Sequence, residues 1–399
     1  MIINPGWSVP HPGIVCDSRA GALAGGPDPG KLPKPRRGAK RSESGRNIVN
    51  VCETRMENTP LKAAVTPEMW EQGIRLADIM MPRFMKQTRE FFQREPGQTH
   101  GRLVHYTTAE AALKIIRTKR FWMRNTNCMS DFSEVQHGLD NLNSFFANTA
   151  KKESFTEALD DCAPGVASEA ITAFNNSWND IRLNSYITCL SEHQDSEDSN
   201  GRLSMWRAFG GTATRIGIVL RIPYPSLSSL PLNIIFSSVA YLSESATHKD
   251  LEEVIGNVRA NRDYLRMIGR DVLVKLVFIS FLFRVVCLKH EGFHEEREWR
   301  AIYAPKLAPY APTLGPSPLM ESSTEVVAGV PQVVYKVPLD ASVSHQIADL
   351  DFTQIFDHLI IGPTSYPWPI YGAFVDELKK AGVANSDERV LISGIPIRF

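Results

Sequence analysis

Residues 289–300, KHEGFHEEREWR, contain a run of charges whose spacing suits chemistry. Glu296, Glu298 and Arg300 follow one another there at two-residue steps. Successive side chains of a strand point to opposite faces, so this spacing predicts two carboxylates and a guanidinium on one strand face. Carboxylates placed in this way can stabilise charge that develops at a reacting centre. A structural ion-pair ladder is the alternative interpretation.

A second acidic group lies at Asp131 and Glu134, in a turn that follows an aromatic strand segment. Together with Glu296 and Glu298, these residues could hold Mg²⁺, which needs only one or two carboxylates besides substrate phosphates. The alternative prediction is therefore a metal-dependent nuclease or phosphohydrolase. Against it, no D/E-x-K or HD-like pattern accompanies the acids, and we assign no metal ligand.

Several short motifs follow one another along residues 101–365. They are HYT at 105–107, NCMSDFSE at 127–134, CLSE at 189–192, MWRAF at 205–209, EREWR at 296–300 and IIGP at 360–363. In this order they resemble the bacterial family catalogued as domain of unknown function 2971. The sequence departs from that family at Cys128-Met129-Ser130, where a Met-Asn pair usually precedes the aspartate, and at Phe209, where tyrosine is common. The family name implies no reaction.

A histidine on a strand, aromatic residues and a glutamate on a later strand are also similar to the layout of ADP-ribosyltransferases. That resemblance implies NAD as a ligand, with a histidine contact to the ribose and an aromatic ring stacked on nicotinamide. The residues it assigns to NAD are His105, Tyr106, Thr107, Trp206 and Arg300, and those it assigns to catalysis are Glu298, Glu296 and His105. The prediction is an NAD-dependent transferase-like enzyme of bacterial stress or phage defence.

Ordinary packing explains several of these residues equally well. His105 lies between apolar neighbours as a core histidine does, and a tryptophan such as Trp206 is commonly a core aromatic. A third function therefore stays open, a non-enzymatic module that binds nucleic acid or protein through one basic cleft. The residues that could line such a cleft are His105, Arg120, Arg124, Lys289 and Arg300.

The charge distribution counts against nucleic-acid binding by the whole chain. Nine of the 44 Lys and Arg residues, but only four of the 44 acids, lie in residues 1–55, which leaves 35 basic against 40 acidic residues beyond them. Residues 1–55 also hold seven prolines and eight glycines, which predicts a disordered basic tail. Met56 is an alternative start, so this tail is either disordered or an over-extended reading frame.

Cysteine usage and hydropathy indicate a cytoplasmic protein outside membranes. The six cysteines form no CxxC pair, and the N-terminus lacks the charged and apolar regions of a signal peptide. The most apolar run, 271–288, is interrupted by Lys275 and Arg284. Val272, Leu276 and Ile279 follow helical spacing there, which predicts a core helix and not a membrane span.

The order of the expected elements places these motifs in one α+β domain. Strands are expected at 102–107, 120–125, 185–191, 214–223, 232–242, 297–304, 332–339 and 357–362, and helices at 108–118, 165–183 and 248–287. Their irregular alternation, without GxGxxG or GxxxxGK[ST] loops, favours a mixed, mostly antiparallel sheet with packed helices. One helix in 56–100 precedes this core at 101–365, a helix–strand extension at 366–399 follows it, and the acidic segment 192–201 is expected to be a loop.

Overall fold

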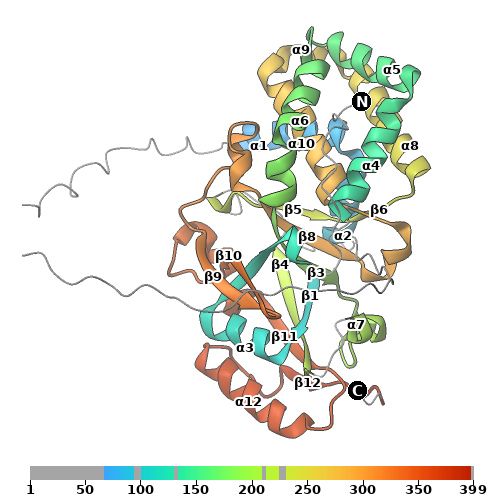
Figure 1. The fold of residues 1–399 in the computed structure, drawn as a ribbon. Coiled ribbons are helices and arrows are strands. Elements are labelled where there is room, and N and C mark those ends of the chain that lie inside the picture. Colours follow the sequence, from blue (N-terminus) through green and yellow to red (C-terminus); the bar gives the residue numbers. More distant parts are fainter. Residues whose placement is uncertain (1–66, 94–99, 130–133, 209–212, 224–230, 397–399) are drawn as a thin grey trace, which may run out of the picture. The chain divides into compact units, whose positions relative to one another are not determined.

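The computed structural model describes residues 67–93, 100–129, 134–208, 213–223 and 231–396, which belong to one compact unit. Within it, ten strands form one mixed sheet in the order β12-β11-β4-β1-β3-β2-β10-β9, with β8 paired to both β3 and β5 (Figure 1). Only β11 and β12 run parallel in this sheet. The expected α+β class with a mostly antiparallel sheet is confirmed. The predicted tail 1–55, Met56 and Asp131 lie outside the described residues.

The strands of this sheet agree closely with the expected segments. They are β1 (His100–Thr108), β2 (Arg120–Asn125), β3 (Tyr186–Glu192), β4 (Arg215–Pro223), β5 (Ile235–Ser238), β8 (Glu298–Tyr303), β9 (Glu321–Val327), β10 (Val330–Pro338), β11 (Phe356–Ile361) and β12 (Val390–Ile392). The segment expected as one strand at 232–242 is divided, because β6 (Ala240–Tyr241) leaves the sheet and pairs with β7 (Leu288–Lys289). β12 extends the main sheet, so the C-terminal extension contributes a strand to it.

Most α-helices of the described residues gather at one end of the sheet, and α3 and α12 lie at the other (Figure 1). The helices are α1 (Pro67–Met80), α2 (Pro82–Phe92), α3 (Ala109–Thr118), α4 (Glu134–Ala147), α5 (Thr149–Asp160), α6 (Val166–Leu183), α7 (Leu203–Ala208), α8 (Glu244–Ala260), α9 (Arg262–Ile268), α10 (Arg270–Val286), α11 (Phe352–Ile355) and α12 (Pro367–Lys380). One large core fills the space among the helices at the first end, and a second lies between the strands and α3 and α12.

Two expected long helices are interrupted at residues that cannot continue a regular helix. Pro82 lacks a backbone N–H, and its ring would clash with the carbonyl four residues earlier, so α1 ends at Met80 and α2 starts at Pro82. The stretch expected as one helix at 248–287 forms α8, α9 and α10. Gly269, between the last two, has φ of 91°, a conformation that residues with a Cβ rarely adopt.

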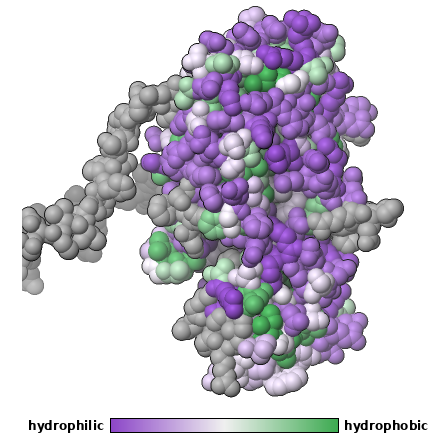
Figure 2. Space-filling view, turned by 90° about the vertical axis from the view of Figure 1, so that its right-hand side faces the viewer, coloured by the Kyte–Doolittle hydropathy of each residue, from purple (hydrophilic) through white to green (hydrophobic). Residues whose placement is uncertain are grey.

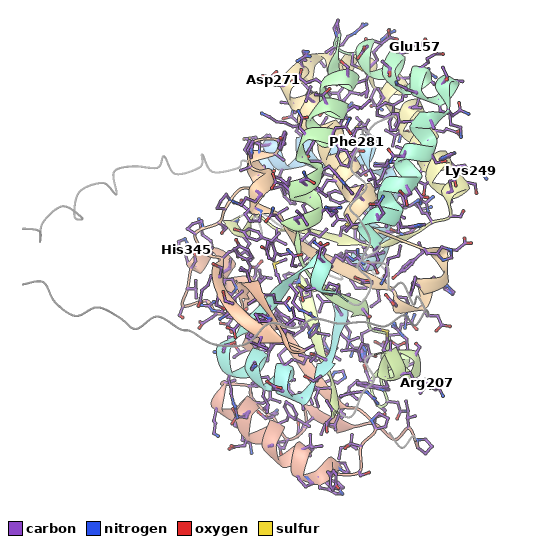
Figure 3. All side chains as sticks on the ribbon, in the orientation of Figure 1. Glu157, Arg207, Lys249, Asp271, Phe281 and His345 are labelled. Carbon is purple, nitrogen blue, oxygen red and sulfur yellow. The ribbon has the colours of Figure 1, made fainter. Side chains whose placement is uncertain are left out.

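Most of the apolar run at 271–288 forms the core helix α10, which ends at Val286, but its buried face differs from the predicted one. Val272 is 44% exposed, whereas Val277 and Phe281 are fully buried among the other helices. Phe281, labelled in Figure 3, belongs to this helical core. In the part of the chain that the structure describes, no helix is long and apolar enough to cross a membrane. Hydrophilic residues dominate the side of the molecule in Figure 2.

Candidate functional site

A cluster of opposite charges lies where β7, β8 and the start of α4 meet. The Nζ of Lys289, the last residue of β7, lies 2.6 Å from a carboxylate oxygen of Glu134 and 2.6 Å from one of Glu296. It also lies 3.0 Å from a carboxylate oxygen of Glu298. The guanidinium of Arg300 binds the other oxygen of Glu298 at 2.7 Å and also pairs with Glu134. Three carboxylates therefore surround two cations.

Backbone groups complete the cluster and fix its orientation. Arg300 Nη1 donates to the carbonyl oxygen of Val286, 2.5 Å away, at the end of α10. The backbone N–H of Glu298 donates to the hydroxyl of Tyr241 on β6, at 2.8 Å. These bonds connect the helical layer to the sheet, so the cluster has a clear structural role.

The three carboxylates differ in exposure and in acidity. Side-chain exposure is 6% for Glu298, 11% for Glu134 and 29% for Glu296. Burial acts to raise the pKa of Glu298, but the charges of Arg300 and Lys289 outweigh it and lower that pKa to about 2. Burial raises the pKa of Glu296, and the neighbouring Glu298 adds to this effect. Glu296, the most exposed of the three carboxylates, therefore also has a raised pKa and binds a proton more tightly than an ordinary glutamate.

The expected strand alternation holds only in part. β8 begins at Glu298, and Arg297 before it has φ of 43°, in the left-handed region. Glu296 is the last residue of a 3₁₀-helical segment, Glu291–Glu296, and not part of the strand. The prediction that it shares a strand face with Glu298 is therefore wrong, although both carboxylates reach Lys289.

Strand register separates His105 from the charged cluster. Directly paired residues of an antiparallel ladder point to the same face, and Val104 pairs with Ser191, which pairs with Glu298. His105 follows Val104 in β1, so its side chain points to the opposite face. The expectation that His105 and Glu298 share one site is therefore wrong.

The surroundings of His105 are those of a core histidine. Its ring packs edge-on against Phe121, with ring centroids 5.1 Å apart. Its Nδ1 lies 2.9 Å from the carbonyl oxygen of Cys189, within hydrogen-bonding distance. Desolvation by the surrounding protein lowers the pKa of His105, so the neutral ring is favoured. Thr107, two residues on, points to the same face and is half-buried.

Trp206 and Tyr106 form a small separate core and present no open aromatic face. Trp206 is 0% exposed and its Nε1 donates to the carbonyl oxygen of Asn200 at 2.8 Å. The Tyr106 ring packs edge-on against it at 4.8 Å, and its hydroxyl accepts from the backbone N–H of Arg202 at 2.9 Å. A Cβ at Gly362 would lie 3.1 Å from the Trp206 ring. Packing thus accounts for Met205 and Trp206 of the MWRAF motif and for Ile360 and Gly362 of IIGP, whereas Phe209 lies outside the described residues.

The carboxylates expected to hold a metal ion are already paired with cations. Glu134 and Glu298 each contact both Lys289 and Arg300, and Glu296 contacts Lys289. A divalent ion placed among them would meet two fixed positive charges. This arrangement does not favour the metal-dependent alternative at these residues.

The basic residues expected to line one cleft have separate partners. Arg120 pairs with Glu321 at 3.2 Å, on the edge of the sheet formed by β9. Arg124 donates to the side chain of Gln332 at 3.3 Å and to the carbonyl oxygen of Cys128 at 2.5 Å. Phe121, against which His105 packs, points to the opposite face of β2 from Arg120 and Arg124, so these residues do not form the expected cleft.

A surface concavity of about 500 Å³ lies beside the segment that carries Glu296. It is lined by Glu197, Arg202, Leu203, Ser204, Arg207, Glu295 and Arg297. Arg202 Nη1 donates to the carbonyl oxygens of Glu295 and Glu296, at 2.8 and 3.2 Å. Arg207 is exposed at the end of α7 (Figure 3) and makes no hydrogen bond or ion pair with the described residues. Arg202 and Arg207 are close in sequence, but Arg297 lies 90 positions beyond Arg207, so the sequence alone gave no sign of this site.

No protein-family model matches this chain, and neither a curated protein nor a solved structure is significantly similar to it.

Proposed function

We propose that the chain is a carboxylate-dependent transferase or hydrolase that cleaves the glycosidic bond of a phosphate-bearing substrate such as NAD, with Glu296 as general base. The observation that carries this proposal is the position of Glu296. It is the most exposed carboxylate of the charged cluster, and its pKa is raised while that of Glu298 is lowered. Environments that separate the pKa values of two neighbouring carboxylates are typical of acid–base sites.

The chemistry of the substrate fits a base better than an acid. Nicotinamide leaves NAD as a neutral group that keeps the electron pair of the broken C–N bond, so it needs no proton. The incoming water or hydroxyl must lose a proton as it attacks the cationic sugar. A carboxylate whose pKa is raised above its ordinary value removes that proton more effectively than an ordinary one. Glu296 meets this need, and Lys289 holds it in place at 2.6 Å.

Glu298 and Arg300 act as positioning residues in this proposal. Glu298 is buried and stays ionised between Lys289 and Arg300, and its negative charge next to Glu296 helps to raise the pKa of Glu296. This differs from the sequence-based hypothesis, in which Glu298 was the catalytic carboxylate. His105 takes no part, because it points to the other face of the sheet from Glu298. Trp206 takes no part, because it is fully buried in a closed core.

The arginine-lined concavity supports a phosphate-bearing substrate. Arg202 bonds the backbone of Glu295 and Glu296, so the concavity and the proposed base belong to the same local structure. The guanidinium N–H groups of Arg207 are available to an incoming anion. A guanidinium group can donate two parallel hydrogen bonds to two oxygens of one phosphate. NAD combines two phosphates with a glycosidic bond that a carboxylate can help to break.

The test is nicotinamide release from NAD by the full chain, compared among the wild type, Glu296→Gln and Glu291→Gln. Glu291 is an exposed glutamate of the same segment and lies outside the ion-pair cluster, so it is the matched control. We expect turnover in the wild type and in Glu291→Gln and a loss of about 10²–10⁴-fold in Glu296→Gln. Turnover that survives in Glu296→Gln, or none in the wild type, would contradict the proposal.

The same concavity favours a second candidate, a module that binds anionic ligands without catalysis. Its lining holds three arginines against two glutamates, and Arg207 is unpaired among the described residues. Retention of single-stranded RNA that weakens with added salt, and weakens further in Arg207→Gln, would support this function if no NAD is consumed. Membership of the unknown-function family stays a prediction.

A further inference from the structure

Two histidines and an aspartate that are distant in sequence meet beside the acidic loop that follows β3. His193 comes directly after β3, and Asp198 follows the 3₁₀ turn Asp195–Glu197. His358 lies in β11, and the strand order β3-β1-β4-β11 carries it to the same region. The backbone N–H of His193 donates to the carbonyl oxygen of Arg102 in β1 at 3.0 Å, which fixes the start of the loop on the sheet.

The side chains of these three residues converge on a small volume. His193 Nε2 lies 2.8 Å from Asp198 Oδ1, and His358 Nε2 lies 4.0 Å from the same atom. The two rings are 5.5 Å apart between centroids, and one nitrogen or oxygen atom from each residue lies within 4.8 Å of the others. A tetrahedral zinc ion with bonds of about 2.0–2.1 Å holds its ligand atoms about 3.3 Å apart. Small side-chain movements therefore suffice to bring all three onto one ion.

The hydrogen bonding of the histidines leaves a place for such an ion. His358 Nε2 is buried, has no hydrogen-bond partner within the described residues, and points toward Asp198. Its side chain is 10% exposed, and that of His193 is 0% exposed. Buried polar atoms are normally satisfied, so an unpaired imidazole nitrogen beside a carboxylate requires an explanation. A bound metal ion is one such explanation, because the ion would accept the lone pair of this nitrogen.

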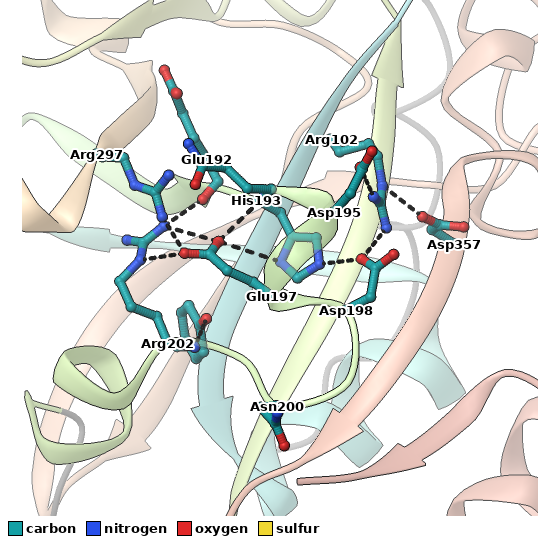
Figure 4. A network of polar contacts seen from close by, with 12 residues as sticks. Arg102, Glu192, His193, Asp195, Glu197, Asp198, Asn200, Arg202, Arg297 and Asp357 are labelled. Atoms are coloured by element: carbon teal, nitrogen blue, oxygen red, sulfur yellow. Dashed lines mark hydrogen bonds and ion pairs between the residues drawn. The ribbon is translucent and has the colours of Figure 1, made fainter. Parts of the chain in front are cut away.

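The charges around the group admit a cation. Arg102 contacts three carboxylates, those of Asp195, Asp198 and Asp357, at 2.5, 2.5 and 3.0 Å (Figure 4). Arg221 adds one further positive charge at Asp357, 3.1 Å away. With Glu197, which lies 4.0 Å from His193 Nδ1 and pairs with Arg202 and Arg297, the network holds four carboxylates and four guanidinium groups, so it carries no excess positive charge when the histidines are neutral. Arg102 Nη2 also donates to Oδ1 of Asp198, the oxygen that lies nearest both histidines, and so fixes the orientation of this carboxylate.

We propose that His193, Asp198 and His358 bind one divalent transition-metal ion of the zinc class. Two imidazoles and one carboxylate are a ligand set that zinc sites with an open position use. The side chain of Asp198 is 40% exposed, so the ion has access from solvent and retains a position for water or another oxygen ligand. This site is separate from the Glu296 cluster, and the proposal does not depend on the proposed function.

The test uses the full chain after treatment with a chelator, titrated with Zn²⁺ and separately with Co²⁺. We expect one Zn²⁺ per chain, a rise of Tm with Zn²⁺, and visible absorption bands of Co²⁺ in a low-coordinate nitrogen and oxygen site. His358→Gln should weaken Zn²⁺ binding by more than about tenfold, because even the loss of a group behind a ligand has that effect. His193→Gln provides a second, independent loss of a ligand.

His248→Gln is the matched control, because His248 also has a buried Nε2 without a hydrogen-bond partner but belongs to no such group of three. It should bind Zn²⁺ as the wild type does. Circular dichroism and Tm without metal show whether each variant folds. Absence of stoichiometric Zn²⁺ binding by the wild type would overturn the proposal, whatever the variants do. Equal binding by folded His358→Gln would also overturn it.

Discussion

Replacement of Lys289 by methionine should destabilise the protein strongly, and more at neutral than at acidic pH. Lys289 is 7% exposed and contacts Glu134, Glu296 and Glu298 at 2.6, 2.6 and 3.0 Å. Methionine is about as long as the four-carbon stem of lysine and lacks the ammonium group, so Glu296 loses its ion-pair partner. Loss of one partner from a buried ion pair costs about 3–5 kcal/mol. At about 1.4 kcal/mol per tenfold change, this lowers the folding equilibrium constant by about two to three and a half orders of magnitude.

The pH dependence follows from the same charges. In the wild type the lowered pKa of Glu298 contributes stability above the pKa of an unfolded glutamate, and this contribution is lost as the pH falls toward 2. Without Lys289 the pKa values of all three carboxylates rise, and those of Glu134 and Glu296, already raised in the wild type, move further above their unfolded values. The folded variant then binds more protons than the unfolded chain near pH 5–7, so its stability falls as the pH rises. The difference from the wild type should therefore shrink at pH 5.

The measurement is urea unfolding of the full chain at pH 7.5 and pH 5. Lys86→Met is the control, because the Lys86–Glu90 pair is exposed on α2 at 3.8 Å and should contribute no more than about 0.5 kcal/mol. If Lys289→Met proves as stable as Lys86→Met, the cluster does not hold the helices on the sheet. An equal destabilisation at both pH values would refute the electrostatic argument and point to lost packing.

Three further predictions concern packing and thiol reactivity. Trp206→Ala should lower the free energy of unfolding in urea by about 3–5 kcal/mol, because Trp206 is fully buried. Trp206→Phe should unfold at a lower urea concentration than the wild type but keep any NAD turnover. A loss of turnover at unchanged stability would instead indicate that Trp206 stacks on the substrate. Gly138→Ala should lower Tm, because its Cβ would lie 2.7 Å from the backbone of α10, and an unchanged Tm would contradict that packing. Burial and the charge of Glu298 raise the pKa of the Cys189 thiol, so iodoacetamide at pH 8 should label Cys189 only after unfolding, as peptide mapping would show.

The sequence predicted the positions of individual strands and helices better than the interruptions of helices and the sides that they bury. β1, β2 and β3 lie within two residues of the expected segments, because each is a short run of apolar and β-branched residues between polar turns. The predicted stripe of α10 failed at Val272, because apolar residues surround most of that helix and spacing alone does not select the buried side. Pro82 was visible in the sequence, and its effect on a helix could have been predicted.

The candidate sites depend on pairing between strands, which spacing along one strand does not reveal. Alternation shows that His105 and Val104 point to opposite sides, but only the register Val104–Ser191–Glu298 shows which side faces the cluster. In the same way, His193 and His358 are 165 positions apart, and they meet because the segment after β3 runs across β1 toward β11 and β12. A loop expected from its acidic composition thus supplies two of the three proposed metal ligands.

Arg202 links the two proposed sites, although they share no ligand. Its guanidinium binds Glu197 at 3.0 Å and the carbonyl oxygen of Glu192 at 2.6 Å, at the two ends of the segment that holds His193. The same guanidinium bonds the backbone of Glu296 at 3.2 Å. Residues in one hydrogen-bond network couple energetically, so substitutions at the two sites should not act additively. The geometry of the loop and that of the proposed base therefore both depend on the side chain of Arg202. Its position in the sequence does not show this role.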